Sequence, residues 1–129
     1  MNTDNGRILA IDRGSHYIWL ARSDDSWFIY PVWYIENDFE SIIYISNIVW
    51  LHRISQIIIG KPKSPKIIEK IEKFARQIYI STEIQPEYVD ENYSTVAAKA
   101  ITGIYTKSTI NDVVAAMEIL KRRLWQSNL

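Results

Sequence analysis

Apolar residues in the first third of the chain come in short runs separated by polar turns, a pattern typical of β-strands. The runs are "RILAID" (residues 7–12), "YIWLAR" (17–22) and "SWFIYPVWYI" (26–35). Three such runs at close spacing predict an antiparallel meander. Because proline cannot donate a hydrogen bond within a sheet, Pro31 indicates that the third strand lies at an edge.

The middle of the chain alternates between helical and strand-like patterns. Residues 38–52 have the length and apolar spacing of a helix, with Asp38 as a candidate N-cap. The run "QIIIG" (56–60) is continuously apolar and ends in glycine, which is typical of a strand buried on both faces. Residues 64–79 form the clearest amphipathic helix, with Ser64 as its cap and Pro65 in its first turn. Its predicted inward stripe is Ile67, Ile68, Ile71, Ala75 and Ile78.

The last third predicts a short strand, "PEYVDE" (86–91), a small helix over 93–102 and a longer one over 109–124. A meander followed by helix-linked, parallel strands gives a mixed five-stranded sheet covered by helices. This order is the ribonuclease-H-like arrangement. We therefore expect an α/β fold with a single domain over residues 1–129.

Composition excludes several classes of protein. The 129 residues are 47% hydrophobic and include no cysteine, which rules out a disulfide framework and a thiolate metal site. No apolar run approaches the ~20 residues that a membrane span requires. The polar start "MNTDNGR" does not resemble a signal peptide. These features predict a cytoplasmic protein without a membrane partner.

The chain has no net charge, but its acidic and basic residues are concentrated in different segments. Fifteen basic residues match fifteen acidic ones. Residues 23–40 carry five acids and no Lys or Arg, whereas residues 53–76 carry seven Lys or Arg against two glutamates. A local basic region can attract phosphates even in a neutral protein. The alternative is an ordinary charged helix face.

Carboxylates fall at the ends of distant predicted elements. Asp12 ends the first strand, Asp90 and Glu91 end the last one, and Asp112 lies in the first turn of the final helix. Strand ends at one edge of a mixed sheet are neighbours. Converging carboxylates repel one another unless a cation compensates, and a set of oxygen ligands suits Mg²⁺ or Mn²⁺. Two such ions can stabilise an in-line phosphodiester displacement.

Each of these acids also has a purely structural explanation. Asp12 and Gly14 are turn formers that could shape a hairpin. Glu91 could favour the helix that follows it through the helix dipole. Asp112 lies three residues after Thr109, which is the spacing of a capping box. If all three structural explanations held, the expected location of the three acids at one edge of the sheet would be a coincidence. The three explanations together are therefore weaker than each one alone.

Five segments in register resemble the motifs of the YqgF family. They are "ILAIDRGSHYIWLARSD", "IIIGKP", "FA", "VDENYST" and "NDVVAAMEIL", and they span roughly residues 7–124. The family pattern is a strand followed by Asp-Pro-Gly-Thr, then Gly-Leu-Pro, then Asp-Glu-Arg-x-Thr, then Asp-Asp-x-Ala-Ala. These are small Holliday-junction-resolvase-like proteins regarded as nucleases of pre-16S rRNA. The resemblance implies a ribonuclease-H-like fold and a divalent-metal-dependent nuclease.

The resemblance also implies roles for particular residues. Asp12, Glu91 and Asp112 match the catalytic and metal-binding acids, with Mg²⁺ or Mn²⁺ as cofactor. Gly14 and Ser15 match the first loop, where backbone N–H groups face the site. The implied partner is nucleic acid, either structured RNA or branched DNA, and the implied state is a monomer or a homodimer.

The chain departs from the family at positions that face the substrate. Asn92 stands where the family has arginine, Arg13 replaces the usual proline, and "HY" (16–17) replaces a basic pair. The loop after Gly60 is the short "KPKSPK". Its lysines and Arg13 could restore the missing positive charge. The predicted nucleic-acid-binding residues are therefore Arg13, Lys61, Lys63 and Lys66.

Structural roles explain the histidine and tryptophan residues considered as candidates more simply than catalysis or base stacking does. His16 could shuttle protons beside Asp12, but a turn histidine without a role is the simpler explanation. Trp19, Trp27 and Trp33 lie on predicted strands. They favour sheet packing or self-association over the stacking of bases.

Two other classes of function fit parts of the sequence. A binding module that grips nucleic acid or a protein without cutting it would explain the loss of the family arginine at Asn92. Retention of all three acids argues against this alternative. The segment "IDRGSHYIWLA" also resembles the first phosphate loop of actin-like and Hsp70-like ATPases. Those proteins need a second phosphate loop and a duplicated core, and this chain has only four glycines.

Overall fold

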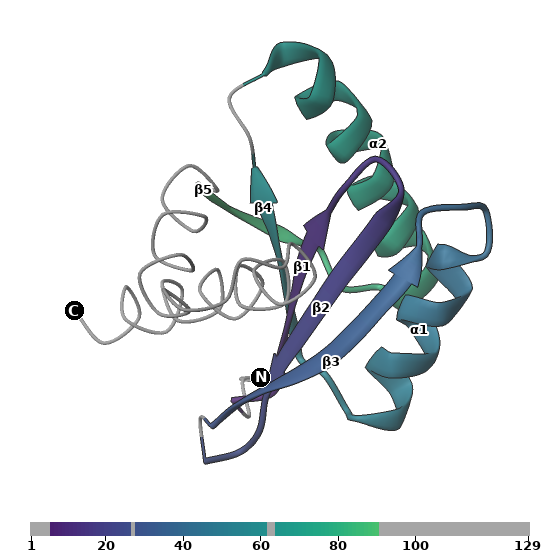
Figure 1. Cartoon of the computed structure of the whole chain (residues 1–129). Coiled ribbons are helices and arrows are strands. Elements are labelled where there is room, and N and C mark those ends of the chain that lie inside the picture. The colour runs from purple at the N-terminus through teal and green to yellow at the C-terminus, as the bar shows by residue number, and fades with distance from the viewer. Residues whose placement is uncertain (1–5, 27, 62–63, 91–129) are drawn as a thin grey trace.

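A computed structural model of the chain describes residues 6–90, except residues 27 and 62–63 (Figure 1). The predicted helices over 93–102 and 109–124, together with Glu91 and Asp112, lie outside the described residues. The predicted order of strands and helices is confirmed as far as Asp90. The elements are β1 (Ile8–Arg13), β2 (Tyr17–Ser23), β3 (Ile29–Glu36), α1 (Ser41–Leu51), β4 (Gln56–Lys61), α2 (Pro65–Thr82) and β5 (Glu87–Asp90).

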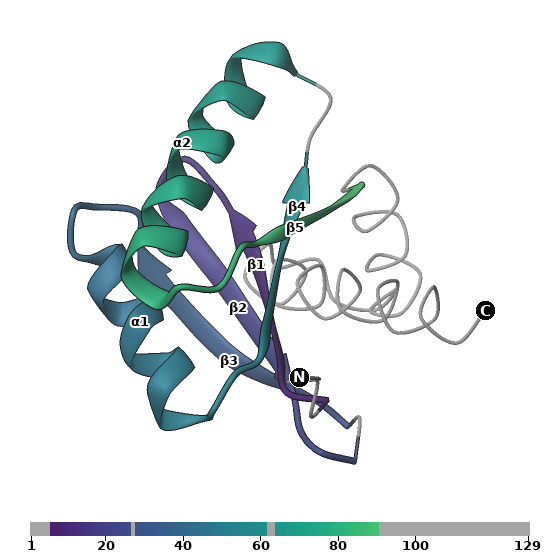
Figure 2. The same ribbon diagram turned by 180° about the vertical axis from the view of Figure 1, so that it is seen from behind.

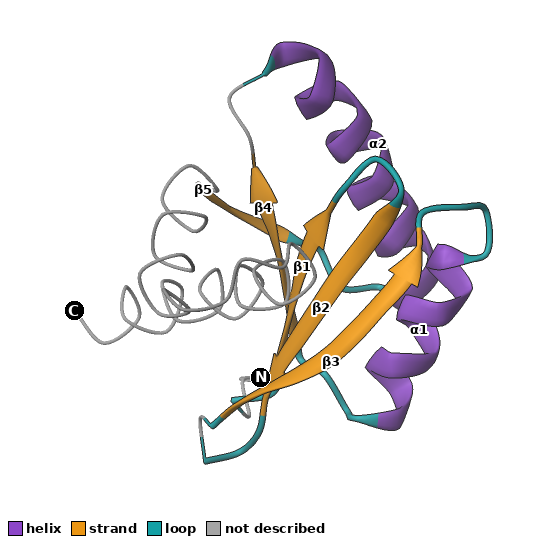
Figure 3. Cartoon of the chain, viewed as in Figure 1, coloured by secondary structure: helices purple, strands orange, loops and turns teal. Residues whose placement is uncertain are grey.

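The five strands form one mixed sheet in the order β3-β2-β1-β4-β5 (Figure 3). β1, β2 and β3 pair antiparallel, whereas β4 pairs parallel with both β1 and β5. The mixed sheet and its meander are therefore confirmed. The edge position predicted from Pro31 is also confirmed, because β3 ends the sheet formed by the described strands and pairs there with β2 alone.

Both helices lie against the same face of the sheet, which we call the helix face (Figure 2). On β1, Leu9 and Ile11 point to this face and pack with Phe74 and Ile78 of α2. The other face carries a second buried cluster. Its members are Ile8, Ala10, Trp19, Ala21, Ile58 and Val89. Side chains of β1 therefore alternate between two apolar layers, as strand geometry requires.

β4 runs through the middle of both layers. Ile57, Ile58 and Ile59 are all fully buried, which confirms the prediction made from the run "QIIIG". Burying an isoleucine side chain contributes about 1.5–3 kcal/mol. These residues therefore anchor the strand whose end lies between β1 and β5.

α1 begins later than the sequence pattern predicted. The N-cap is Glu40 and not Asp38, whose Oδ1 instead accepts a hydrogen bond from the Glu40 N–H at 2.9 Å in the preceding turn. The helix packs through Ile45 and Val49. Phe39, which the apolar spacing counted toward the helix, is 88% exposed because it precedes the first turn.

α2 is capped and packed largely as predicted. Ser64 precedes the helix with extended backbone and Pro65 takes its first position, although the Ser64 side chain makes no capping hydrogen bond. Of the predicted inward stripe, Ile71, Ala75 and Ile78 are buried and Ile68 is partly buried. Ile67 is 44% exposed and lies in the first turn. Phe74, absent from that stripe, is buried. Neither described helix has the length and apolar character needed to cross a membrane.

The β1–β2 connection is a tight turn that depends on Gly14. The Gly14 N–H donates a hydrogen bond to the Tyr17 carbonyl oxygen at 2.8 Å. A Cβ atom at position 14 would lie 2.9 Å from that same oxygen, which is closer than a carbon can approach without a backbone shift.

Gly14→Ala is therefore expected to lower the free energy of unfolding by about 1–3 kcal/mol, because the added methyl group forces the turn apart. Chemical denaturation measures this difference. Ser15→Ala in the same turn is the control, because Ser15 is exposed and should change stability by less than about 0.5 kcal/mol. Equal stability of the two variants would contradict the steric explanation.

Candidate functional site

The carboxyl ends of β1, β4 and β5 meet at one edge of the sheet, which we call the carboxyl edge. The parallel register pairs Ile11 with Ile59, and therefore brings Asp12 beside Gly60. Gly60 in turn pairs with Val89, and the next pair joins Lys61 to Asp90. Since neighbouring strands lie ≈ 4.8 Å apart, the backbones at Asp12 and Val89 are about 10 Å apart. The predicted convergence of the first and last strands is thus correct for their backbones.

Asp12 points to the face of the sheet opposite the helices. It follows Ala10 by two residues and pairs across to Trp19, and both of these belong to the second buried cluster. Trp19 is 7% exposed and packs against Tyr34, with ring centroids 4.9 Å apart. The predicted packing role of Trp19 is confirmed. Trp27 is outside the described residues.

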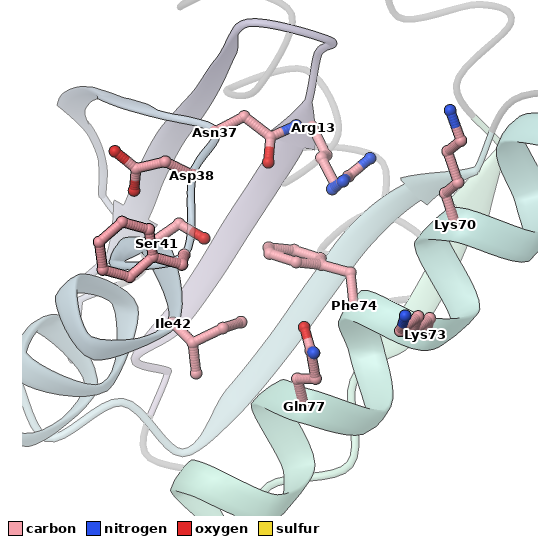
Figure 4. A pocket seen from close by; sticks show the side chains of 10 residues that line it. Arg13, Asn37, Asp38, Ser41, Ile42, Lys70, Lys73, Phe74 and Gln77 are labelled. Atoms are coloured by element: carbon pink, nitrogen blue, oxygen red, sulfur yellow. The ribbon is translucent and has the colours of Figure 1, made fainter.

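Arg13, one residue further, points to the helix face. Its guanidinium carbon lies 5.2 Å from the centroid of the Phe74 ring, a cation–π contact with α2 (Figure 4). Burial lowers the pKa of Arg13 from its usual value, but an arginine remains charged at neutral pH. Among the described residues, Arg13 Nε is the one buried side-chain nitrogen or oxygen without a hydrogen-bond partner. The sequence placed Arg13 and Asp12 at one site, whereas the strand directs them to opposite faces.

Arg13 lines a cavity of about 390 Å³ between α2 and the β3–α1 loop, which we call the helix-face pocket. Phe74 and Ile42 form part of its apolar wall, as Figure 4 shows. Its charged and amide side chains are Arg13, Asn37, Asp38, Lys70, Lys73 and Gln77. A cavity of this size falls within the ~300–1,000 Å³ range of ligand sites.

The loop that forms one wall of this pocket is fixed to the β1–β2 turn. Asn37 Nδ2 donates to the Gly14 carbonyl oxygen at 2.7 Å, and the Asn37 N–H donates to the His16 carbonyl oxygen at 2.9 Å. The Gly14 N–H donates within the turn, whereas the Gly14 carbonyl oxygen accepts from the loop. The turn that follows Asp12 and Arg13 is thus also a structural support for the pocket.

Two of the remaining predicted basic residues, Lys61 and Lys66, belong to the described part of the chain. Lys61, the last residue of β4, places its Nζ 4.8 Å from the centroid of the Tyr88 ring. Lys66 is exposed in the first turn of α2. Lys63 lies outside the described residues. Sequence reasoning missed Lys70 and Lys73, although both belong to the basic segment 53–76 that the charge distribution had indicated.

The described residues alone do not make a metal site. No three His, Cys, Asp or Glu side chains gather within the described part of residues 6–90. Asp12 is partly buried there and supplies carboxylate oxygens of the kind that Mg²⁺ and Mn²⁺ prefer. Any ion at the carboxyl edge would therefore need further ligands from beyond Asp90, where Glu91 and Asp112 lie.

Comparison with known proteins gives consistent matches. A family model described as "RuvX: Holliday junction resolvase" matches residues 6–126. The chain is 31% identical to a "Putative pre-16S rRNA nuclease" of Dictyoglomus turgidum, a match that covers 74% of this chain and 73% of the relative. It is 30% identical to a protein of the same name from Carboxydothermus hydrogenoformans, over 74% of this chain and 75% of the relative.

A solved structure shares the fold. It is Thermus thermophilus RuvC in complex with a Holliday junction substrate, with a TM-score of 0.56, 8% sequence identity, and coverage of 92% of this chain and 96% of that one. At this identity the likeness concerns the fold alone. It confirms the ribonuclease-H-like arrangement predicted from the order of strands and helices.

Proposed function

Because the chain belongs to the RuvX family of Holliday-junction-resolvase-like nucleases, we propose that it is a divalent-metal-dependent nuclease that hydrolyses phosphodiester bonds. Its substrate would be structured RNA, such as a ribosomal RNA precursor, or branched DNA. The names of the two curated relatives favour the RNA substrate. The single domain over residues 1–129 would act as a monomer or a homodimer.

The observation that supports this proposal is the alignment of Asp12 with the end of β5 across the carboxyl edge. β5 ends at Asp90, and a peptide bond joins Asp90 directly to Glu91. In this proposal Glu91, the next residue of the chain after β5, would supply the second carboxylate.

In this proposal Asp12, Glu91 and Asp112 hold Mg²⁺ or Mn²⁺. Bound there, the ion would stabilise negative charge on the attacking and leaving oxygens of an in-line displacement. Asp12 would contribute a ligand whose position is fixed by β1, since Trp19 and Gly60 border it on the neighbouring strands. Lys61, Lys63 and Lys66 would contact phosphates next to the cleaved bond.

A second candidate is a ribonuclease-H-like module that binds nucleic acid or protein without cutting. Asn92, at the position of the family arginine, favours it, because an amide cannot neutralise a phosphate. Cleavage and metal binding distinguish the two candidates.

Millimolar Mg²⁺ or Mn²⁺ is expected to raise the melting temperature, because an ion that binds only the native state stabilises it by about 1.4 kcal/mol at ten times its Kd. Asp12→Asn should abolish this response and raise stability without metal by about 1 kcal/mol through relief of carboxylate repulsion. Glu69→Gln on α2 is the control, since it removes an exposed acid elsewhere. An undiminished metal response in Asp12→Asn would exclude Asp12 as a ligand.

Cleavage is the corresponding test of activity. We expect Mn²⁺-dependent cleavage of structured RNA or a four-way DNA junction by the parent chain, and a loss of at least 100-fold in Asp12→Asn, comparable to loss of a key electrostatic group. Gel analysis of end-labelled substrates measures the rate. Tight binding with no cleavage by the parent chain would favour the binding module instead.

Lys61→Ala together with Lys63→Ala should weaken binding of any duplex sequence and reduce the log–log salt slope by up to about two, since each phosphate contact contributes about 0.9. Fluorescence anisotropy over a salt series measures both quantities. Arg53→Gln, near the opposite end of β4, is the control. The metal response should survive because no acid is changed, and an unaltered salt slope would remove these lysines from the interface.

A further inference from the structure

We propose that the helix-face pocket binds a phosphate group through Arg13, Lys70 and Lys73. This site lies on the face of the sheet opposite Asp12, and its ability to bind phosphate does not depend on the nuclease activity proposed above.

Arg13 is a partly buried cation whose Nε is buried without a hydrogen-bond partner. Within the part of the chain that the structure describes, no carboxylate forms an ion pair with it, and its Nε has no hydrogen-bond partner. A buried N–H group without a hydrogen-bond partner is unfavourable, so such groups in proteins ordinarily find an acceptor. The Phe74 ring lies against the guanidinium and offers only its π face. An anion in the pocket would complete the coordination of Arg13.

The rest of the pocket favours an anion as well. Lys70 and Lys73 extend from neighbouring positions of α2, and Gln77 adds an amide one turn further (Figure 4). Asp38 is the one acid among the lining residues, and its Oδ1 already accepts the Glu40 N–H. The described residues that line the pocket therefore carry three positive charges and one negative charge.

Phosphate fits this donor set better than a carboxylate ligand does. A guanidinium presents paired N–H groups that match two phosphate oxygens, and lysines add point charges for a third. The cavity of about 390 Å³ has room for a phosphate with an attached sugar. The ligand class is therefore a phosphate mono- or diester.

Such a phosphate could come from nucleic acid or from a small phosphorylated molecule. Arg13 directly follows Asp12 at the carboxyl edge, so a strand crossing that edge could present one phosphate to each face. Binding of a nucleic-acid phosphate rests on the proposed nuclease function. Binding of a small phosphate ester does not depend on that function. The experiment below separates the two.

The first arm measures melting temperature against inorganic phosphate at constant ionic strength, with chloride as the balancing salt. The parent chain should gain about 3 °C or more at saturating phosphate. Lys70→Gln with Lys73→Gln should lose this gain, whereas Arg53→Gln with Arg76→Gln, which removes the same charge outside the pocket, should keep it. No gain in the parent chain, or an equal gain in both double variants, would overturn the proposal.

Arg13→Met provides a second, independent variant. Methionine keeps an apolar stem against Phe74 and removes the uncompensated charge, so the melting temperature without phosphate should stay level or rise. The phosphate gain should disappear. A folded Arg13→Met variant that keeps the full phosphate gain would overturn the assignment of Arg13.

The second arm measures binding of structured RNA and of a four-way DNA junction over a salt series. If the phosphate belongs to nucleic acid, Lys70→Gln with Lys73→Gln should weaken binding and lower the salt slope by up to about two. If phosphate stabilisation is lost while nucleic-acid binding is unchanged, the pocket takes a free phosphate ester. If the nuclease proposal alone is wrong, the parent chain will not cleave nucleic acid but its melting temperature will still rise with phosphate.

Discussion

Successive side chains of a β-strand point to opposite faces of the sheet, and at the end of β1 this constraint separates Asp12 from Arg13. Asp12 faces the side of Trp19 and Val89, while Arg13 faces α2 and Phe74. One edge of the sheet therefore carries a carboxylate on one face and a cation on the other. The two proposals follow from this division: metal ions on the Asp12 side, and a phosphate group on the helix face.

The division is stable because the strands that form the carboxyl edge are held from both sides. Ile57, Ile58 and Ile59 of β4 are fully buried between the two apolar clusters, so β1 and β5 are aligned by a strand that has little freedom to shift. A shift of one residue would turn every side chain to the other face. Asn37 and Gly14 add a local restraint by joining the β3–α1 loop to the turn after β1.

Sequence patterns predicted the strands, both described helices and the edge position of β3, because apolar periodicity and proline report directly on burial and hydrogen bonding. They misplaced the start of α1, since Asp38 and Glu40 both precede an apolar run and only the folded turn shows which one is the cap. They grouped Arg13 with Asp12, because adjacency in sequence does not show which face a residue occupies. The helix-face pocket was missed for a similar reason. In the sequence, Lys70 and Lys73 have the spacing of an ordinary solvated helix face, and only the folded structure shows that they line a pocket with Arg13. The roles of Glu91 and Asp112 stay predictions.

The central claim is that a divalent ion binds at the carboxyl edge on the Asp12 side. Paramagnetic broadening of backbone amide NMR signals by substoichiometric Mn²⁺ tests it most directly, because broadening falls steeply with distance from the ion. The signals of Asp12, Gly60 and Val89, aligned across the edge, should broaden first, while those of Ser55 and Gln56 at the other end of β4 should stay sharp. Broadening that begins at the acidic β2–β3 turn around Asp24 and Asp25, with the carboxyl edge unaffected, would contradict the claim.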